Sequence, residues 1–565
     1  MADLAEINDL LRSSGTWHRS HAASVRCQRR AGQGRILVAA RSMRRGDVIL
    51  ADRALSCVGT PSPGTGAAEV FAQLVHWHRR RDGAGTGGLS EATEQDISTV
   101  WCALHGLLAR EVPADWPLTT WTPELQHRAL LLHSSGRKPS ASTRQLRSFF
   151  RLSIAVEKLE QLMEVWELNS FGHTTHEDIT CLFFSPAFAN HSCMPTASWY
   201  IAGDTMELRA MVDLAEGDEI TDSYIEDEDL LACTARRRRR LLESGKAFRC
   251  LCKRCRAAID MSRGAPCPSC GVGVVFIGTT DSDDRDILVK PRSAWIGTQH
   301  TNQARQVATQ QMSSWCNPSR CTACGHCLSE AEEALLVNIE LKIEARLHQA
   351  SVSQEPGAVL ERCRRLMKLH LGETTHWLSR VVHGLLKNVA EDAGDVCAEL
   401  ELLDLRAAFV RNAFGRKSAS GDELLIPCPT HAWELEEAAR LCLRKHASAY
   451  GTTRTGKDQP LFSCSRTKAR AAARADARWR LEECLAILRP MFGPGNEDVR
   501  RVSRLLQSLH RRKAGGRRLR AANAGVRVQH LRPHRRVHRR IERLRRLSKA
   551  CRADEQNRSR KCAVH

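Results

Sequence analysis

Short apolar runs and turn-forming residues alternate in the first part of the chain, which is typical of β-structure. Residues 35–40 and 48–50 are apolar runs with a turn sequence between them. From 59 to 88 the chain is rich in Gly, Pro, Ser and Thr, and this composition indicates loops. Residues 92–168 carry apolar side chains at helical spacing. The pattern predicts a helical insertion that interrupts a β-rich fold.

Apolar runs typical of strands return between 169 and 224. Gly203-Asp204 stands between two such runs, at 199–201 and 206–208, and predicts a hairpin turn. The charged segment from Arg236 to Glu243 then predicts a short basic helix. We therefore expect the second half of the β-rich fold here.

Beyond residue 327 the pattern becomes helical. Ser329 and Glu332 have the spacing of a capping box, and apolar residues at helical spacing follow them. Another helix is expected from Asn496. The region 330–510 shows helical patterns without a strict repeat period, so a tetratricopeptide-like array is one interpretation of it.

The length and composition allow several folded domains. With 565 residues the chain has room for three or four cores. The first 17 residues mix charged and apolar side chains, unlike a signal peptide, and no run of 18 or more apolar residues occurs. We expect no membrane partner. Of 23 cysteines, nine lie between Cys250 and Cys327. Such close spacing without a secretory signal favours metal binding over disulfides.

The net charge of +21 is concentrated in the C-terminal segment. Residues 511–565 hold 20 Lys or Arg and three acidic residues, which leaves a net +4 for the first 510 residues. A basic tail of this kind favours nucleic-acid binding through phosphates, or nuclear import. It has no aromatic side chain for base stacking, and a solvated, disordered tail is the alternative. We expect localisation in the nucleus, the cytoplasm or both.

A first cysteine cluster contains Cys250, Cys252 and Cys255. Three thiolates at this spacing suit one tetrahedral zinc, and a distant fourth thiolate would complete the site. The alternative is a turn that is merely rich in reactive thiols.

A second cluster consists of two C-x2-C pairs, each followed by glycine, with 50 residues between the pairs. Each pair fits a zinc knuckle, and together they predict a zinc ribbon with a long, poorly ordered loop. Cys316 and Cys327 are close enough in sequence to replace one of the ligands. The expected ligands are Cys267, Cys270, Cys321 and Cys324.

Four further elements stand in a fixed order around the first cluster. They are Asn190-His191-Ser192-Cys193, then Gly217-Asp218-Glu219, then Tyr224, then Phe248 directly before Cys250. Their joint order resembles the SET-domain protein-lysine methyltransferases, in the SET and MYND (SMYD-like) branch. The resemblance is close over 20–58 and 165–330 and looser over 355–510.

The resemblance implies S-adenosylmethionine as the methyl donor and a protein with an exposed lysine as the substrate. In-line transfer of a methyl group needs a neutral amine, a narrow apolar channel and a fixed donor. The resemblance assigns the lysine channel to Tyr224 and Phe171, and the fourth ligand of the first zinc to Cys193. It assigns the cofactor to Gln33, Gly34, Arg35, Asn169, Asn190, His191, Tyr224 and Phe248.

Three departures from this family's pattern stand out. Ile36 occupies the place of a second glycine in the first loop, where a side chain would crowd the cofactor. Thr196 stands where the family usually has asparagine. No cysteine pair with C-x2-C spacing precedes Cys250, so the MYND zinc finger is missing.

We therefore expect an α+β protein with a β-rich SET fold split by a helical insertion, a zinc-bound post-SET and ribbon segment, and a helical, tetratricopeptide-like C-terminal domain. The expected function is protein-lysine N-methylation. The alternative is a catalytically silent SET scaffold that binds proteins through its ribbon and helices. The expected segments are 20–58 and 165–247 for the SET fold, 59–164 for the insertion, 248–328 for the post-SET and ribbon, 329–510 for the helical domain and 511–565 for the basic tail.

Overall fold

The computed structural model divides the chain into two compact units. Unit 1 comprises Met1–Tyr224, Arg240–Cys252 and Leu488–Asn496, and unit 2 comprises Ile225–Arg239, Lys253–Ile487 and Glu497–His565. The structure describes residues 4–14, 24–61, 65–81, 91–108, 122–132, 138–176, 178–257, 259–278, 320–350, 353–414, 416–417, 423–424, 428–448 and 463–511.

One sheet of unit 1 has the strand order β1-β2-β10-β7. β1 (Val25–Arg30) and β2 (Gly34–Ala39) form an antiparallel hairpin. β10 (Glu219–Asp222) pairs antiparallel with β2, and the two-residue strand β7 (Asn190–His191) pairs parallel with β10. This parallel pair places two distant sequence segments side by side.

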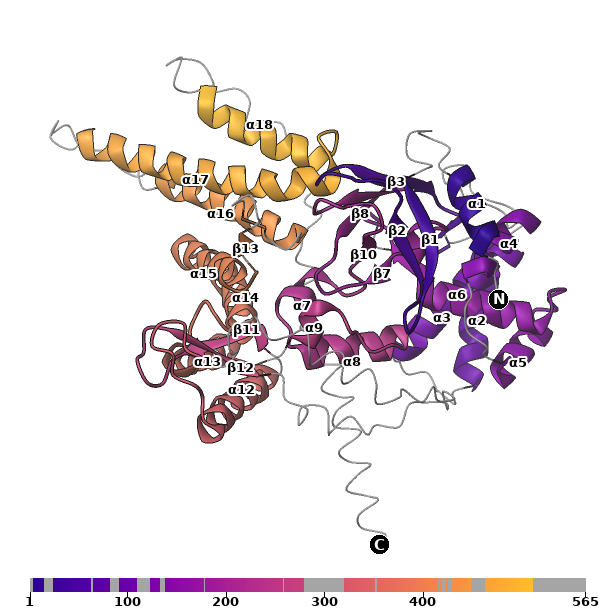
Figure 1. Cartoon of the computed structure of the whole chain (residues 1–565), viewed down its shortest axis with the longest axis horizontal. Coiled ribbons are helices and arrows are strands. Elements are labelled where there is room, and N and C mark those ends of the chain that lie inside the picture. Colours follow the sequence, from indigo (N-terminus) through magenta and orange to yellow (C-terminus); the bar gives the residue numbers. More distant parts are fainter. Residues whose placement is uncertain are drawn as a thin grey trace, which may run out of the picture. The chain divides into compact units, whose positions relative to one another are not determined.

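Two three-stranded sheets complete the β-structure of unit 1, with orders β3-β9-β8 and β4-β6-β5. Ala202 pairs with Thr205 in the β8–β9 hairpin, which confirms the turn expected at Gly203-Asp204. Figure 1 shows the strands of unit 1 together, with the helices of the insertion on one side of them. The strands are β3 (Val48–Arg53), β4 (Ser56–Val58), β5 (Ser170–Gly172), β6 (Thr180–Leu182), β8 (Ala197–Ala202) and β9 (Thr205–Ala210).

The helices of unit 1 share a core with its strands. Trp101, Leu104 and Trp166 are buried in the same apolar cluster as Leu37. The last helix, α6, ends at Asn169 and leads directly into β5. The helical elements are α1 (Leu4–Ser14), α2 (Gly66–Arg81), α3 (Glu91–Leu108), α4 (Pro123–Leu132), α5 (Ala141–Phe149), α6 (Val156–Asn169) and the 3-10 turn η1 (Pro186–Phe188).

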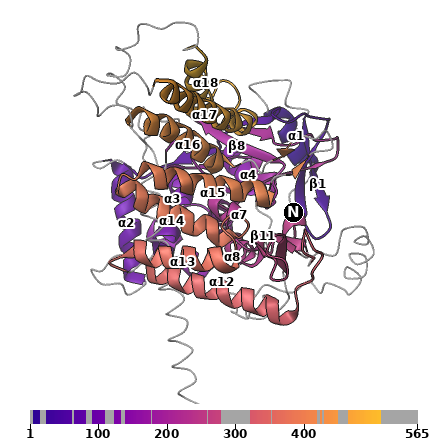
Figure 2. The same ribbon diagram turned by 90° about the vertical axis from the view of Figure 1, so that its left-hand side faces the viewer.

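Helices α12 to α16 of unit 2 pack one against the next in chain order, as Figure 2 shows. α12 begins with the expected capping box: the Ser329 N–H donates to Glu332 Oε2 over 2.8 Å, and the Glu332 N–H donates to Ser329 Oγ over 3.3 Å. These helices are α12 (Glu330–Ala350), α13 (Pro356–His370), α14 (Trp377–Asp392), α15 (Val396–Phe414) and α16 (Pro429–Ser448).

The remaining elements of unit 2 are short helices, two antiparallel strand pairs and two C-terminal helices. α8 crosses from unit 2 into unit 1, and the last residues of α17 count with unit 1. The elements are α7 (Asp227–Leu231), α8 (Ala235–Lys246), α9 (Lys253–Arg256), β11 (Ile259–Pro266), β12 (Val274–Gly278), β13 (Arg416–Lys417), β14 (Glu423–Leu424), α17 (Ser463–Phe492) and α18 (Glu497–Arg511).

Two sequence expectations lie outside the described residues. The poorly ordered loop expected between the C-x2-C pairs falls mostly in 279–319, and the basic tail falls in 512–565. Among the described helices, none combines the length and the apolar character needed to cross a bilayer.

Candidate active site and metal centres

The parallel pairing of β7 with β10 builds the candidate active site. Thr221 pairs with Asn190 and Asp222 with His191, and the Ser192 N–H donates to the Asp222 carbonyl over 2.9 Å. Residues that are 33 positions apart in sequence are thereby joined, since the Tyr224 backbone N–H donates to His191 Nδ1 over 3.0 Å. The backbone ladder fixes their relative position.

His191 connects this site to a cysteine. Because its Nδ1 accepts the Tyr224 N–H, the neutral ring carries its proton on Nε2. Nε2 lies 3.2 Å from Cys193 Sγ, within reach of a hydrogen bond to sulfur. The imidazole therefore donates to the thiol group of Cys193 while it accepts from the backbone at Tyr224.

Three rings form an aromatic cluster next to the paired strands β7 and β10. The His191 and Tyr224 centroids are 5.5 Å apart, and Phe248 lies 6.1 Å from His191 and 6.2 Å from Tyr224. Ala247, directly before Phe248, has a φ of +57°, a left-handed conformation that ends α8. This turn brings the Phe248 ring back against the other two.

The Tyr224 hydroxyl is held within the protein. It donates to the Ala189 carbonyl over 2.7 Å. Burial raises the pKa of Tyr224, and the nearby Asp222 carboxylate raises it further, so the hydroxyl stays protonated at neutral pH. Tyr224 can therefore act as a hydrogen-bond donor and as a wall for a ligand, but not as a base.

A pair of charged side chains borders Tyr224, and sequence reasoning missed both members. Lys246 Nζ lies 5.9 Å from the centroid of the Tyr224 ring. Asp222 is 1% exposed, and burial raises its pKa well above the usual value, against the opposing effect of Lys246. Asp222 is the last residue of β10, and the last three residues of this strand are buried.

Phe171 lies in a different ring cluster from the one around Tyr224. Its centroid is 6.0 Å from Phe183 and 5.5 Å from Trp199, in a core shared with Cys181. Asn169 ends α6, and its side chain donates to the Val165 carbonyl over 3.2 Å. The structure thus brings His191, Tyr224 and Phe248 together, and it places Phe171 in a separate cluster with Phe183 and Trp199.

Two of the predicted cofactor residues, Gln33 and Gly34, lie in the first loop, before and at the start of β2. Gly34 has a φ of +75°, which favours glycine, and a Cβ there would meet no atom within 4 Å. Gln33, next to it, accepts from the Arg30 guanidinium over 3.2 Å. Open space at Gly34 leaves its backbone approachable by a ligand.

Arg35 turns its side chain away from this loop. Its guanidinium donates to the Leu131 and Leu132 carbonyls at the end of α4 and lies 5.1 Å from the Phe188 ring centroid. A cation at a helix C-terminus is favoured by the helix dipole. Arg35 therefore attaches α4 to β2, and only its backbone is left for a cofactor. Ile36 beside it is 1% exposed.

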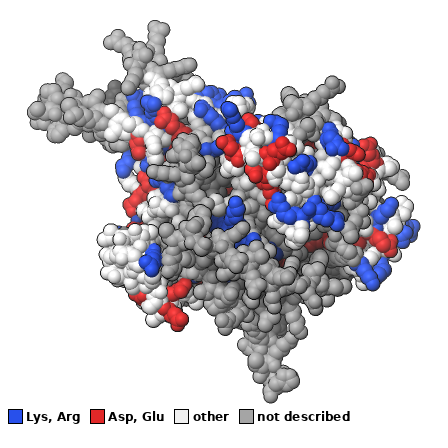
Figure 3. Space-filling view, in the orientation of Figure 1, with Lys and Arg blue, Asp and Glu red and all other residues white. Residues whose placement is uncertain are grey.

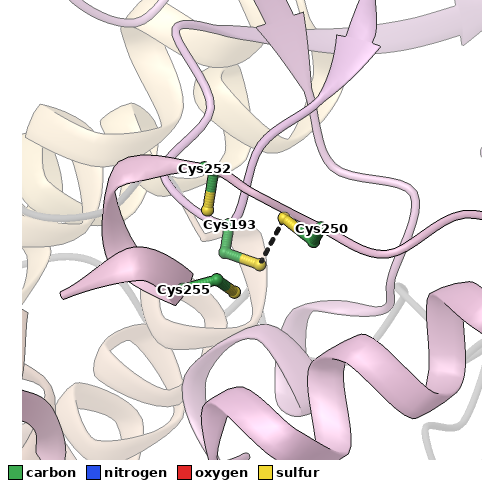
Figure 4. Close-up of side chains that lie close together, drawn as sticks. All are labelled: Cys193, Cys250, Cys252 and Cys255. Atoms are coloured by element: carbon green, nitrogen blue, oxygen red, sulfur yellow. Dashed lines mark hydrogen bonds between the residues drawn. The ribbon is translucent and has the colours of Figure 1, made fainter. Parts of the chain in front are cut away.

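The first cysteine cluster brings together all four predicted sulfur atoms. Those of Cys193, Cys250, Cys252 and Cys255 all lie within 4.8 Å of one another and face a common point (Figure 4). The Cys193 and Cys250 sulfurs are 4.0 Å apart. Zinc with tetrahedral bonds of about 2.3 Å requires sulfur separations of about 3.8 Å, and none of the four cysteines forms a disulfide. The donor set fits zinc.

Arg238 supports one of these sulfurs from α8. Its Nη2 lies 3.7 Å from Cys255 Sγ, and its Nη1 lies 3.6 Å from Asp260 Oδ2. The Arg238 side chain is fully buried, so Asp260 supplies the charge that burial of a guanidinium requires. An arginine N–H aimed at sulfur favours the thiolate form that zinc binds.

The second cluster also brings its four predicted ligands together. The sulfur atoms of Cys267, Cys270, Cys321 and Cys324 lie within 4.8 Å of one another, and two cross-pairs are each 3.7 Å apart. The ligands come from the β11–β12 turn and from the segment before α12. This arrangement is that of a zinc ribbon, and its spacing fits a tetrahedral ion.

The two knuckles of this cluster have matching backbone geometry. The Gly271 N–H donates to the Cys267 carbonyl over 2.9 Å, and the Gly325 N–H donates to the Cys321 carbonyl over 3.1 Å. Both glycines have positive φ, +66° and +73°. The backbone N–H of Cys324 is the main cause that lowers the pKa of the Cys321 thiol to about 6, which favours its thiolate.

A third cluster of possible metal ligands consists of glutamates, and it does not have the features of a metal site. Glu391, Glu399 and Glu437 place oxygens within 4.8 Å of one another. Lys387 Nζ already lies 3.1 Å from Glu391 and 2.8 Å from Glu437. The ammonium group supplies the positive charge that these carboxylates need.

Comparison with known proteins assigns the fold of the central region. The sequence model of the SET domain matches residues 34–225, which include β2, β7 and β10. Residues 34–225 form a SET domain. It contains Asn190, His191 and Tyr224, while Phe248 and the first cysteine cluster's last three members follow it.

Curated relatives match short parts of the chain. A SET and MYND domain-containing protein of Dictyostelium discoideum is 40% identical over 71 residues, 12% of this chain and 13% of the relative. A second such protein from the same organism is 30% identical over 104 residues, 18% of this chain and 24% of the relative. The chain thus spans less than a quarter of the length of these two relatives.

Solved structures give only weak similarity. The SET domain of LSMT bound to lysine and AdoHcy is 12% identical, with a TM-score of 0.26, over 93% of this chain and 98% of that one. The LSMT complex with methyllysine and AdoHcy gives a TM-score of 0.25 at 12% identity, over 72% of this chain and 94% of that one. At these TM-scores the comparison adds nothing to the SET domain assignment.

Figure 3 shows how charged side chains are spread over one face of the protein. Lys and Arg side chains are interspersed with Asp and Glu over the described residues visible there. This mixture agrees with the small net charge, +4, of the first 510 residues.

Proposed function

We propose that the protein is an S-adenosylmethionine-dependent protein-lysine N-methyltransferase. The observation that carries this proposal is the junction of β7 and β10 in the SET domain. It joins Asn190-His191 to Tyr224 by a backbone ladder and a direct hydrogen bond. Phe248 closes the same cluster with its ring.

The proposed donor would lie against this cluster, with Asn169, Asn190 and His191 supplying polar groups. S-adenosylmethionine supplies an electrophilic methyl group on sulfur. Phe248 provides an aromatic face for its adenine, and the open backbone at Gly34 allows close approach of its amino-acid part. Tyr224 positions the reacting amine, because its ring and hydroxyl are fixed by His191 and Ala189.

The proposed zinc ions have a structural role. The first would join Cys193, two residues after His191, to Cys250, two residues after Phe248. It would therefore hold the two aromatic walls of the site at a fixed separation. The second would close the ribbon, which the β11–β12 hairpin alone cannot stabilise in water.

Calorimetry with S-adenosylmethionine and transfer of a labelled methyl group to cell-extract proteins test the proposal. We expect binding, and label on lysine of at least one protein. Tyr224→Phe should lower the transfer rate at least tenfold or change the number of methyl groups added, with zinc content unchanged. Tyr200→Phe is the matched control, because the Tyr200 ring packs on Phe492 and is not part of the His191–Tyr224–Phe248 cluster.

A catalytically silent SET scaffold is the second candidate, and Ile36 favours it. Ile36 occupies the position where SMYD-like proteins usually have glycine. It belongs to β2, directly after the first loop, and its side chain is almost fully buried. If the wild-type chain binds no S-adenosylmethionine, Ile36→Gly should restore binding under the enzyme proposal. Failure of both proteins to bind would contradict the enzyme proposal and support the scaffold.

The substrate proposal is a protein with a flexible, exposed lysine, in the nucleus or the cytoplasm. Any nucleic-acid binding would come from the basic tail, so deletion of 511–565 should remove it. Methyl transfer to a protein without bound nucleic acid should survive this deletion, because the predicted site residues precede 511.

A further inference from the structure

A lysine of this chain lies against the proposed catalytic tyrosine. Lys246 Nζ is 5.9 Å from the Tyr224 ring centroid. It donates to the Leu168 carbonyl over 2.9 Å and to the Glu167 carbonyl over 3.3 Å. These carbonyls directly precede Asn169, a proposed cofactor residue. The amine therefore lies between two parts of the proposed methyl-transfer site.

The backbone holds Lys246 in this place. It is the last residue of α8, and Ala247 after it adopts the left-handed conformation before Phe248 enters the ring cluster. A non-glycine residue in this conformation costs energy, so the surrounding contacts must hold it. Lys246 and Phe248, two residues apart, thus both lie near the Tyr224 ring.

The surroundings of Lys246 also favour the neutral amine that methyl transfer needs. Burial lowers the pKa of Lys246, with Asp222 and Glu167 opposing the effect. Asp222 Oδ1 is buried and has no hydrogen-bond partner among the described residues. Asp222 therefore affects Lys246 through its charge and not through a hydrogen bond to Oδ1.

We propose that Lys246 is a site of self-methylation, an inference that rests on the proposed methyltransferase function. The ammonium group first gives a proton to water. The lone pair of Nζ then forms a bond to the methyl carbon of S-adenosylmethionine, and the carbon–sulfur bond breaks. Its electron pair stays on sulfur, so the products are S-adenosylhomocysteine and a methylammonium group on Lys246.

Methylation would change the local contacts of this side chain. Each added methyl group replaces an N–H, and Lys246 uses two N–H groups for the Glu167 and Leu168 carbonyls. A dimethylated or trimethylated amine could not keep both bonds. The modification would therefore loosen the link between α8 and the end of α6, next to Asn169.

The test uses the full chain with S-adenosylmethionine that carries a deuterated methyl group. After digestion at acidic residues, mass spectrometry should find the label on Lys246. The labelling rate should be independent of protein concentration over a tenfold range, as expected for transfer within one chain. Lys246→Arg should remove this label, while Lys368→Arg, which changes an exposed lysine on α13, should leave it unchanged.

Two other outcomes separate this inference from the proposed function. If the chain binds S-adenosylmethionine and labels other proteins but not Lys246, self-methylation is wrong and the function stands. A labelling rate that rises with protein concentration also contradicts it, because the transfer then occurs between molecules. If no S-adenosylmethionine binds and no protein is labelled, both proposals fail together.

Discussion

His191 Nε2 lies 3.2 Å from Cys193 Sγ, so one imidazole contacts both the proposed cofactor site and the first cysteine cluster. Because the two sites share the His191 side chain, a substitution in one site should alter ligand binding at the other. A hydrogen bond to a metal-bound sulfur fixes the orientation of both groups.

His191→Ala should weaken zinc binding at the first cluster by about 10–100-fold, because an outer hydrogen bond to a ligand is lost. Competition with a chromophoric chelator measures this affinity. His510→Ala changes an exposed histidine on α18 and should leave it unchanged. Equal zinc affinity in His191→Ala and the wild type would show that the His191–Cys193 contact has no such role.

The purified protein should contain about two zinc ions per chain, one for each tetrahedral thiolate site. Elemental analysis by mass spectrometry measures this ratio. Cys252→Ser and Cys324→Ser should each remove about one ion, and the double variant should remove both. Cys397→Ser, at an exposed cysteine outside both clusters, is the control. A wild-type content of one would eliminate one of the two sites.

Gly273→Ala should selectively disrupt the second site. A Cβ at Gly273 would overlap Cys321 Sγ and would lie 2.7 Å from the Ala323 backbone nitrogen. The knuckle would have to open, and we expect zinc content to fall from about two to about one. Gly495→Ala introduces the same group into open space and should keep both ions. Full zinc retention by Gly273→Ala would show that the knuckle can shift without losing the metal.

Arg380→Met should strongly destabilise unit 2. Arg380 is fully buried and donates to Glu434 over 3.1 Å and to Glu228 over 2.8 Å. Removal of one partner leaves buried charge uncompensated and costs about 3–5 kcal/mol.

Hydrogen exchange of the α14–α16 amides, compared between variants, measures this loss. Arg478→Ala removes an exposed pair with Glu482 and should cost less than about 1 kcal/mol. If the two variants exchanged alike, the buried network would not contribute to the stability of these helices.

Acid should weaken unit 2 through Glu340. Burial alone would raise the pKa of Glu340, but hydrogen bonds from His376 and Arg263 lower it to about 2. An unfolded glutamate has a pKa of about 4.3, so its contribution is present above that value and is lost as pH falls towards 2.

Glu340→Gln should therefore lower the thermal midpoint most near neutral pH. The difference between wild type and variant should shrink from pH about 4.5 downward, which a pH series of melting curves measures. Acid also releases zinc from thiolates, but this loss affects both proteins. Glu361→Gln, at an exposed glutamate on α13, should show no such difference. A difference that persists at pH 2 would contradict the assigned role of the charge.

Local patterns in the sequence predicted several elements correctly. The Gly203-Asp204 turn and the Ser329–Glu332 capping box depend on neighbouring residues, and both are present. The cysteine spacing within each knuckle is local as well. Joining Cys193 to Cys250 required the family resemblance, because no local pattern links residues 57 positions apart.

Long-range use of polar side chains was not predictable in this way. Arg35 was assigned to the cofactor loop, but its guanidinium binds the end of α4, about 96 residues away. Nothing in the spacing of a charged side chain tells which distant carbonyls it will meet. Lys246 and Asp222 were missed for the same reason, since their interaction depends on how α8 ends beside β10.

Phe171 shows a further limit of assignment by motif. Its place in the sequence after Asn169 matches the family pattern, yet its ring packs with Phe183 and Trp199. An aromatic residue on a short strand can face either side, and the choice depends on packing of the whole sheet. Its assignment to the lysine channel stays a prediction.

Unit 1 is completed by a segment from far along the chain. The Phe492 ring packs on the Tyr200 ring. A Cβ added at Gly46 would lie 3.5 Å from Pro490, and a Cβ added at Gly493 would overlap the Arg209 guanidinium, so both glycines lie close to their partner residues. Residues 225–487 include most of unit 2 and are synthesised before this segment. During synthesis, unit 1 can therefore complete its fold only after residue 496 has been added to the chain. Until then the β8–β9 hairpin lacks its contacts with residues 488–496.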